Sequence, residues 1–217
     1  MICIQLKNHW EDCLNMNENI AKAGSLIVST TVAIFAFCML VDFSFGSYFI
    51  CMILPIGFIM MTSGFYNESE SSKKVAAMNG VIFATIYAVL IVIVYFAQTT
   101  TVRLETLTPQ ASQILDFSKG GLIFNYDLLG YGFMALSTFF TGLTIENKMK
   151  SDKVLKWLMM IHGVFFIVCL IMPMTGILVQ TADSGSSKGG VIALECWCVY
   201  FIPIGILSFI HFRKTKK

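Results

Sequence analysis

The sequence predicts an all-α fold, a polytopic membrane protein built as a six-transmembrane-helix bundle. Of its 217 residues, 56% are apolar and only 13% are charged, and the mean hydropathy is +0.75. A soluble domain carries about twice that charged fraction. Six segments have the roughly 20 apolar residues that are needed to cross a bilayer core of about 30 Å. The composition therefore excludes a soluble enzyme, a nucleic-acid-binding protein and a disordered chain.

The predicted elements begin with a polar, cytoplasmic N-terminal segment, 1–24, which lacks the short basic head of a signal peptide. Within it, Met16 opens a plausible alternative start, so we interpret residues 1–15 as an upstream extension. One membrane domain, 25–212, follows, because no loop is long enough to hold a second folded domain. Its spans are expected at about 25–43, 46–66, 76–98, 121–145, 155–178 and 190–212.

Two connections between the spans stand out. The outer segment 99–120 is 22 residues long, and loops of that length are usually functional or mobile. The connection 183–190 is rich in Gly and Ser and is expected to be a flexible tether. We expect 99–120 to form a lid over the outer end of the bundle.

The orientation is predicted from the basic residues outside the spans. Twelve of the 15 Lys and Arg lie in the N-terminal segment, the second and fourth connections and the basic cytoplasmic tail, 213–217. The other side holds Arg103, Lys119 and Lys188. Because cytoplasmic loops are enriched in Lys and Arg, both termini are predicted to be cytoplasmic and the number of spans to be even.

Packing faces and kinks can also be predicted. Gly80, Ala84 and Ala88 form a stripe of small residues on the third span, and such stripes allow helices in lipid to approach closely. Prolines inside the second, fifth and sixth spans each remove a backbone hydrogen bond and should kink their helices. These prolines are Pro55, Pro173 and Pro203.

Carboxyl groups within the spans are the best functional candidates, because a charge near the bilayer centre costs on the order of 3 kcal/mol. Asp127 and Glu195 are expected roughly 8 to 9 Å below the outer ends of the fourth and sixth spans, and Asp42 ends the first span. Tyr131 lies one turn from Asp127 on the same face. We predict that these side chains line an outward-facing acidic pocket that binds a proton or a small ligand.

Each candidate has a structural alternative. Asp42 is better explained by a position among the lipid headgroups. In the alternative, the side chains of Asp127 and Glu195 reach toward the membrane–water interface or pair with Arg103 or Lys119 from the long loop. We give the binding pocket and this structural alternative equal weight for these two residues.

His162 has no second histidine at its depth, which argues against a bis-histidine haem. A lone histidine in a helix bundle is more often a hydrogen-bonding core residue than a proton relay. The sequence also has no nucleotide-binding, catalytic or metal-binding motif. No catalytic residue, metal ligand or cofactor is therefore assigned, and the candidate ligand- or proton-binding residues are Asp127, Glu195, Asp42, Tyr131, Arg103 and His162.

The stretch Asn-Tyr-Asp-Leu-Leu-Gly-Tyr-Gly at 125–132 and the Lys-Trp-Leu that opens the fifth span resemble small uncharacterised multi-pass membrane proteins of bacteria. The resemblance covers the six-span outline and carries no known activity. It implies a location in the bacterial plasma membrane.

Three functions fit these observations, in this order. The first is a small transporter or ligand-binding membrane protein with an outward-facing acidic pocket. The second is a lipid-acting enzyme that uses Asp127 and Glu195 as general acid and base, although we lean away from an enzyme. The third is a noncatalytic assembly or sensor protein whose basic segment 148–156 captures a partner. The expected partners are the lipid bilayer and a small-molecule or cation ligand, not nucleic acid, and no oligomeric state is indicated.

Overall fold

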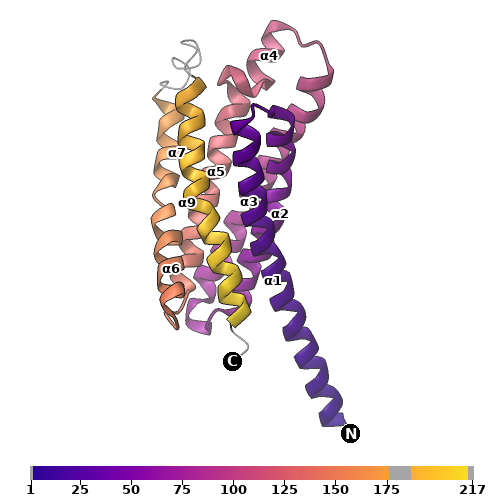
Figure 1. Ribbon diagram of the computed structural model, residues 1–217, viewed down its shortest axis with the longest axis vertical. Coiled ribbons are helices and arrows are strands. Elements are labelled where there is room, and N and C mark those ends of the chain that lie inside the picture. Colours follow the sequence, from indigo (N-terminus) through magenta and orange to yellow (C-terminus); the bar gives the residue numbers. More distant parts are fainter. Residues whose placement is uncertain (1, 176–186, 215–217) are drawn as a thin grey trace.

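The computed structural model describes residues 2–175 and 187–214, and for 2–15 and 187–190 the backbone alone. The regular structure of these residues is helical, as the sequence predicts, and the chain is an all-α protein (Figure 1). The helices are α1 (Ile2–Leu40), α2 (Ser44–Glu68), α3 (Lys74–Ala97), α4 (Pro109–Leu115), α5 (Leu122–Thr144), α6 (Lys150–His162), α7 (Phe165–Met174) and α9 (Ser187–Lys214).

Five helical segments are long and apolar enough to cross a membrane, which supports the predicted class of protein. They are Met16–Leu40, Ser44–Glu68, Ser71–Val102, Lys150–Met174 and Val191–Lys214. The expected fourth span, α5, is not among them, because its buried face carries Asp127, Ser137, Thr138 and Thr141 and is correspondingly less apolar. The count of six spans and the orientation of the termini stay predictions.

The long helices form a closed ring. α1 packs against α2 and α9, α2 against α3, α3 against α5, α5 against both α6 and α7, and α6 against α9. α6 and α7 together act as one rod of this ring (Figure 1). The N-terminal part of α1 extends beyond the other helices, so the polar segment 1–24 continues the first span as a helix from Ile2. We call the two ends of the bundle the α4 end and the C-terminal end.

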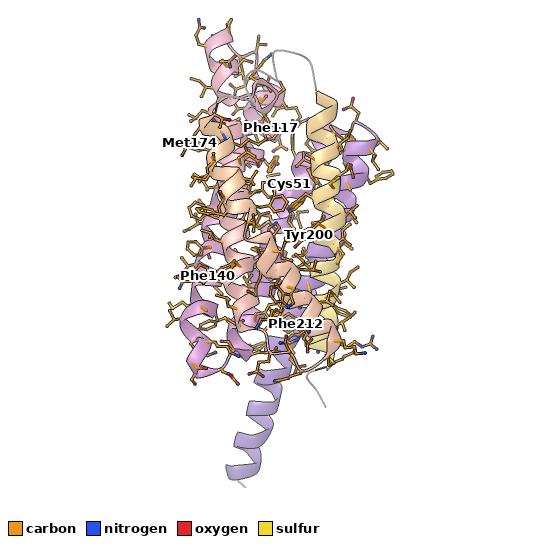
Figure 2. All side chains as sticks on the ribbon, turned by 90° about the vertical axis from the view of Figure 1, so that its left-hand side faces the viewer. Cys51, Phe117, Phe140, Met174, Tyr200 and Phe212 are labelled. Carbon is orange, nitrogen blue, oxygen red and sulfur yellow. The ribbon has the colours of Figure 1, made fainter. Side chains whose placement is uncertain are left out.

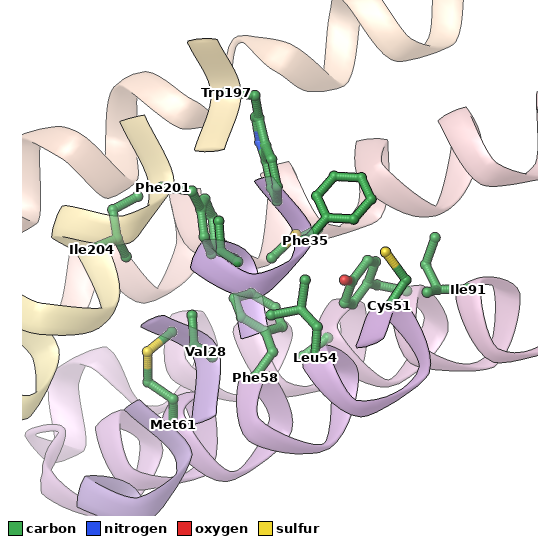
Figure 3. Packing of buried hydrophobic residues seen from close by; sticks show 14 of the residues in the cluster. Val28, Phe35, Cys51, Leu54, Phe58, Met61, Ile91, Trp197, Phe201 and Ile204 are labelled. Carbon is green, nitrogen blue, oxygen red and sulfur yellow. The ribbon is translucent and has the colours of Figure 1, made fainter. Parts of the chain in front are cut away.

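The ring is held together by very close helix crossings. A Cβ atom added to Gly24 of α1 would lie 2.6 Å from the Gly57 carbonyl oxygen and 2.6 Å from the Met61 nitrogen of α2. Only glycine therefore lets these two backbones approach so closely. Apolar side chains from α1, α2 and α9 fill the space beside the crossing (Figure 3).

The stripe of small residues on α3 is buried, as its predicted packing role requires, and Gly80 contacts α5. Gly80, Ala84 and Ala88 are all buried. The Ser137 hydroxyl of α5 donates a hydrogen bond of 2.6 Å to the Gly80 carbonyl oxygen, and a Cβ atom at Gly80 would lie 2.6 Å from Oγ1 of Thr141. Close backbone approach thus permits a direct hydrogen bond between the two helices.

The fifth span is interrupted at Gly163 and Val164, between α6 and α7. A Cβ atom at Gly163 would lie 2.7 Å from Cβ of Phe139 on α5, so the interruption coincides with a close contact. Pro173, where the sequence predicts a kink, lies in the last turn of α7, next to Met174. The fifth span therefore changes its helical geometry about ten residues earlier than the proline alone indicates.

The segment 99–120 is largely helical rather than an open loop. It contains most of a π-helical turn (Gln98–Val102), the whole of α4, and a 3₁₀ turn (Phe117–Lys119). Thr108 caps α4 by accepting a hydrogen bond from the Ala111 nitrogen, and Pro109 occupies its first turn. Of the predicted tether 183–190, residues 183–186 lie outside the described residues, and 187–190 begin α9.

Candidate functional site

A cluster of buried polar side chains lies in the half of the bundle nearer to α4. It consists of Cys51 on α2, Tyr87 and Tyr95 on α3, and Asp127 and Tyr131 on α5, and we call it the Asp127 cluster. The Tyr131 hydroxyl lies 3.9 Å from Sγ of Cys51, and Tyr95 interacts with the Asp127 carboxyl. Three helices therefore converge on the one carboxyl group of this cluster.

Two polar atoms of the Asp127 cluster have no hydrogen-bond partner among the described residues. They are Oδ1 of Asp127 and the hydroxyl oxygen of Tyr87, and both are buried. The two side chains are only 5% and 0% exposed. An ionised carboxylate that is buried without a counter-charge is very costly, so this group requires a proton or a bound cation.

The segment 99–120 covers the cluster on the α4 side. The Phe117 ring contacts the rings of Tyr95 and Tyr48, with centroid distances of 6.1 and 5.9 Å, and Figure 2 shows it above Cys51, toward the α4 end. Gln98 holds this cover in place, because its side chain donates to the Leu115 carbonyl oxygen at 2.8 Å and accepts from the Phe117 nitrogen at 3.0 Å. The Gln98 side chain thus holds the cover next to α3 through hydrogen bonds to two backbone groups.

Aromatic rings close the bundle on the other side of the cluster. Phe58 of α2, Tyr87 of α3, Tyr131 of α5, and Trp197 and Phe201 of α9 contact one another in a closed circuit, which we call the aromatic layer. Successive ring centroids lie 4.9 to 6.2 Å apart. Trp197 and Phe201 lie side by side in Figure 3, facing the α1 and α2 side chains. The layer shares Tyr87 and Tyr131 with the Asp127 cluster and extends from them to α2 and α9.

His162 is a fully hydrogen-bonded residue next to the aromatic layer. The Trp197 indole nitrogen donates to Nε2 of His162 at 3.1 Å, so Nε2 is an acceptor. Nδ1 lies 2.8 Å from Oγ1 of Thr138, whose hydroxyl is itself 2.9 Å from the Ala135 carbonyl oxygen. This geometry fits a neutral imidazole with its proton on Nδ1, the hydrogen-bonding role that the sequence favours for His162 over a proton relay.

Glu195 lies apart from Asp127. Its Oε1 is a further buried atom without a hydrogen-bond partner among the described residues. Among the described residues, no hydrogen bond joins the carboxyl groups of Glu195 and Asp127.

Asp42 and Arg103 lie outside the cluster. Asp42 is exposed in the tight turn between α1 and α2, with a left-handed φ of 54°. Nε of Arg103 donates to the Thr99 carbonyl oxygen at 3.0 Å, and the guanidinium group lies 4.8 Å from the Phe45 ring centroid. Among the described residues, neither Arg103 nor Lys119 forms an ion pair with a carboxylate.

The structure therefore brings together Asp127 and Tyr131 but adds neither Glu195, Asp42 nor Arg103 to them. Sequence reasoning missed Cys51, Tyr87 and Tyr95. The two tyrosines could have been found, because each interrupts the long apolar run of the third span with a hydroxyl group that needs a partner.

The fold and the cluster define a helical membrane protein in which the Asp127 carboxyl is buried among tyrosines. Comparisons of the chain with protein-family models, with curated proteins and with solved structures gave no match.

Proposed function

We propose that the chain is a small transporter of the plasma membrane, and that Asp127 is the group that binds and releases a proton or a small cation during transport. The observation that carries this proposal is the buried Oδ1 atom of Asp127, which has no hydrogen-bond partner among the described residues. Ionisable groups inside membrane bundles most often mark ion and proton pathways.

The proposal includes six spans, with α5 as the fourth. α5 has 23 residues, which corresponds to about 34 Å of helix and is enough to cross the bilayer core. It also occupies a place in the ring between α3 and the α6–α7 rod. A polar helix that is shielded from lipid by its neighbours is tolerated in a membrane, because its polar groups are satisfied inside the bundle. With six spans, the distribution of Lys and Arg favours cytoplasmic termini and a position of α4 outside the cell.

Two barriers support a transport role. The Phe117 cover lies over the Asp127 cluster on the α4 side, and the aromatic layer lies beneath it. Alternating access requires a binding group that is shielded from both sides in turn. The enzyme hypothesis is weaker, because an acid–base pair needs two carboxyls within reach of one substrate, and Asp127 and Glu195 do not contact each other.

A carbodiimide test addresses the proposed role directly, since carbodiimides modify protonated carboxyl groups in apolar surroundings. The purified protein in lipid nanodiscs is treated with dicyclohexylcarbodiimide, and the modified residue is located by mass spectrometry. We expect modification at Asp127, abolished in Asp127→Asn and retained in the matched control Glu195→Gln. Protection by Na⁺, K⁺ or Li⁺ would identify a cation as the ligand, whereas dependence on pH alone would identify the proton.

A flux measurement completes the test. Proteoliposomes that contain a pH-sensitive dye report proton movement under an imposed gradient, and isotope uptake reports each of the three cations. Asp127→Asn should reduce the flux at least about tenfold, and its thermal unfolding should match wild type because Asn resembles the neutral carboxyl. A folded Asp127→Asn variant with wild-type flux would refute the proposal.

A further inference from the structure

A cavity with a volume of about 590 Å³ lies at the C-terminal end of the bundle, far from the Asp127 cluster. Five carboxylates line it, namely Glu18, Glu68, Glu70, Glu146 and Asp152. The basic groups in its wall are Lys148, Lys214 and His211. His211 is therefore surrounded by more carboxylates than lysines.

His211 of α9 joins two of these carboxylates. Its Nδ1 lies 3.0 Å from Oδ1 of Asp152 on α6, and its Nε2 lies 3.0 Å from Oε2 of Glu68 on α2. The His211, Asp152 and Glu68 side chains are 12%, 1% and 21% exposed. We call these three residues the His211 triad.

The geometry of the triad specifies where protons must lie. A neutral imidazole has one N–H donor and one acceptor nitrogen, and an acceptor nitrogen cannot bond to a carboxylate oxygen. With both carboxyl groups ionised, both contacts are hydrogen bonds only if both ring nitrogens carry a proton, which makes His211 an imidazolium between two carboxylates. His162 differs, because an indole N–H faces its Nε2.

The triad joins three helix ends. Glu68 is the last residue of α2, Asp152 lies in the first turn of α6, and His211 lies in the last turn of α9. Oδ2 of Asp152 also accepts a hydrogen bond of 3.0 Å from the Met149 nitrogen, which fixes this carboxylate at the start of α6. The triad thus ties together elements that the chain itself does not connect at this end.

Aromatic packing closes the bundle beside the triad. The Phe65 ring lies 5.3 Å from the His211 ring and 4.6 Å from the Phe212 ring, centroid to centroid. Phe212 is fully buried, and Figure 2 shows it near the C-terminal end. Separation of α9 from α2 would therefore open a path from the cavity into the bundle.

The other three carboxylates that line the cavity each form an ion pair with a lysine. Glu18 binds Lys22 at 2.9 Å, Glu70 binds Lys73 at 3.3 Å, and Glu146 binds Lys73 at 3.5 Å. Glu146 also binds Lys148 at 3.0 Å and raises the pKa of that lysine. Lys214 lies on the same helix as His211 and lines the cavity.

We propose that His211 is a second proton-binding site, and that its proton closes the C-terminal end of the bundle by joining α2, α6 and α9. Loss of the proton removes one hydrogen bond and both ion pairs, and it leaves a lone pair facing a carboxylate. The closed state is thus favoured while the proton is bound and is lost as the pH rises. This inference does not rest on Asp127, and it holds whether or not the chain transports a cation.

Nitrogen NMR of the full chain with ¹⁵N-labelled histidine, in lipid nanodiscs, tests the proton assignment. The chain has three histidines, and His211→Gln identifies the signal of His211. At about pH 7, we expect both His211 ring nitrogens to be protonated and His162 to carry a single proton. A neutral His211 at that pH would overturn the proposal.

Amide hydrogen exchange, corrected for the intrinsic effect of pH, tests the closure. Between about pH 6 and pH 10, exchange in the last turn of α9 and the first turn of α6 should rise about tenfold or more, as expected for loss of a charge-assisted hydrogen bond. Unchanged wild-type exchange over that range would contradict the mechanism.

Glu68→Gln separates charge from packing. Its amide can donate to Nε2 of a neutral His211, whose Nδ1–H still bonds to Asp152. We expect this variant to stay closed across the pH range, whereas His211→Gln should exchange rapidly at every pH. A Glu68→Gln variant that still opens as the pH rises would refute the role of the His211 proton.

Discussion

The crossing of α1 and α2 at Gly24 allows the most quantitative prediction of stability. In Gly24→Ala, the new methyl group would lie 2.6 Å from two backbone atoms and from Cβ of Met60, none of which can rotate away. Ordinary contacts begin at 3.4 Å, so the helices must separate by about 0.8 Å. Overpacking of this kind costs typically 1–3 kcal/mol.

A gain in helix propensity offsets part of that cost. Alanine is about 0.5–1 kcal/mol better than glycine within a helix, so Gly24→Ala should lower the free energy of unfolding by about 1–2 kcal/mol. Gly132 of α5 is the matched control, because a Cβ atom there would lie 3.4 Å from Cβ of Cys169 and from Cδ2 of Phe166, at an ordinary distance. Gly132→Ala should therefore be neutral or more stable than wild type.

Unfolding of the purified protein by SDS in mixed micelles measures both variants on one scale. The two should differ by about 2 kcal/mol, which corresponds to a factor of about 30 in the folded-to-unfolded ratio. If Gly24→Ala proved as stable as Gly132→Ala, the assumption that the helix crossing cannot relax would be wrong.

Two further predictions concern single hydrogen-bonding side chains. Trp197→Phe removes the donor to Nε2 of the buried His162 and should destabilise the protein by about 1–3 kcal/mol in thermal unfolding. The control Trp157→Phe changes a residue that is 52% exposed and should have little effect. Equal melting temperatures of the two variants would contradict the importance of the bond. Gln98→Ala removes the hydrogen bonds to the backbone of Leu115 and Phe117 and should accelerate limited proteolysis of the segment 99–120. Gln110→Ala, at an exposed residue of the same segment, is the control. An unchanged rate of proteolysis in Gln98→Ala would show that other contacts hold the cover.

The sequence was sufficient to predict the helical class and the faces on which helices pack. Gly80, Ala84 and Ala88 identify a contact face of α3 because small residues at four-residue spacing let helices approach closely. The four-residue spacing of Asp127 and Tyr131 likewise predicted that the two side chains lie on one face of α5. Both predictions depend on periodicity within one helix, which the sequence contains directly.

The sequence was not sufficient to predict which carboxyls share a site. Depth along a helix can be counted, but the rotation of one helix relative to its neighbours depends on packing between side chains that are distant in the chain. In the part of α9 near Glu195, the buried residues are Trp197, Cys198 and Phe201. Glu195 consequently lies at the edge of the buried face, although the sequence predicts the same depth for it as for Asp127.

The His211 triad was missed for a related reason. Its three members are separated by 84 residues between Glu68 and Asp152, and by a further 59 up to His211. Each lies at a helix end, where the sequence alone suggests an ordinary solvated charge. Only the closed ring of helices brings the three ends together.

Pro203 creates a point in α9 at which the helix can bend. It lies six residues after Trp197 and eight before His211, and it has no N–H to bond with the Val199 carbonyl oxygen. Bending at this point allows the C-terminal half of α9 to swing away from α2 while Trp197 keeps its place in the aromatic layer. Pro203 therefore divides α9 into a part that belongs to the aromatic layer and a part that carries His211 of the triad.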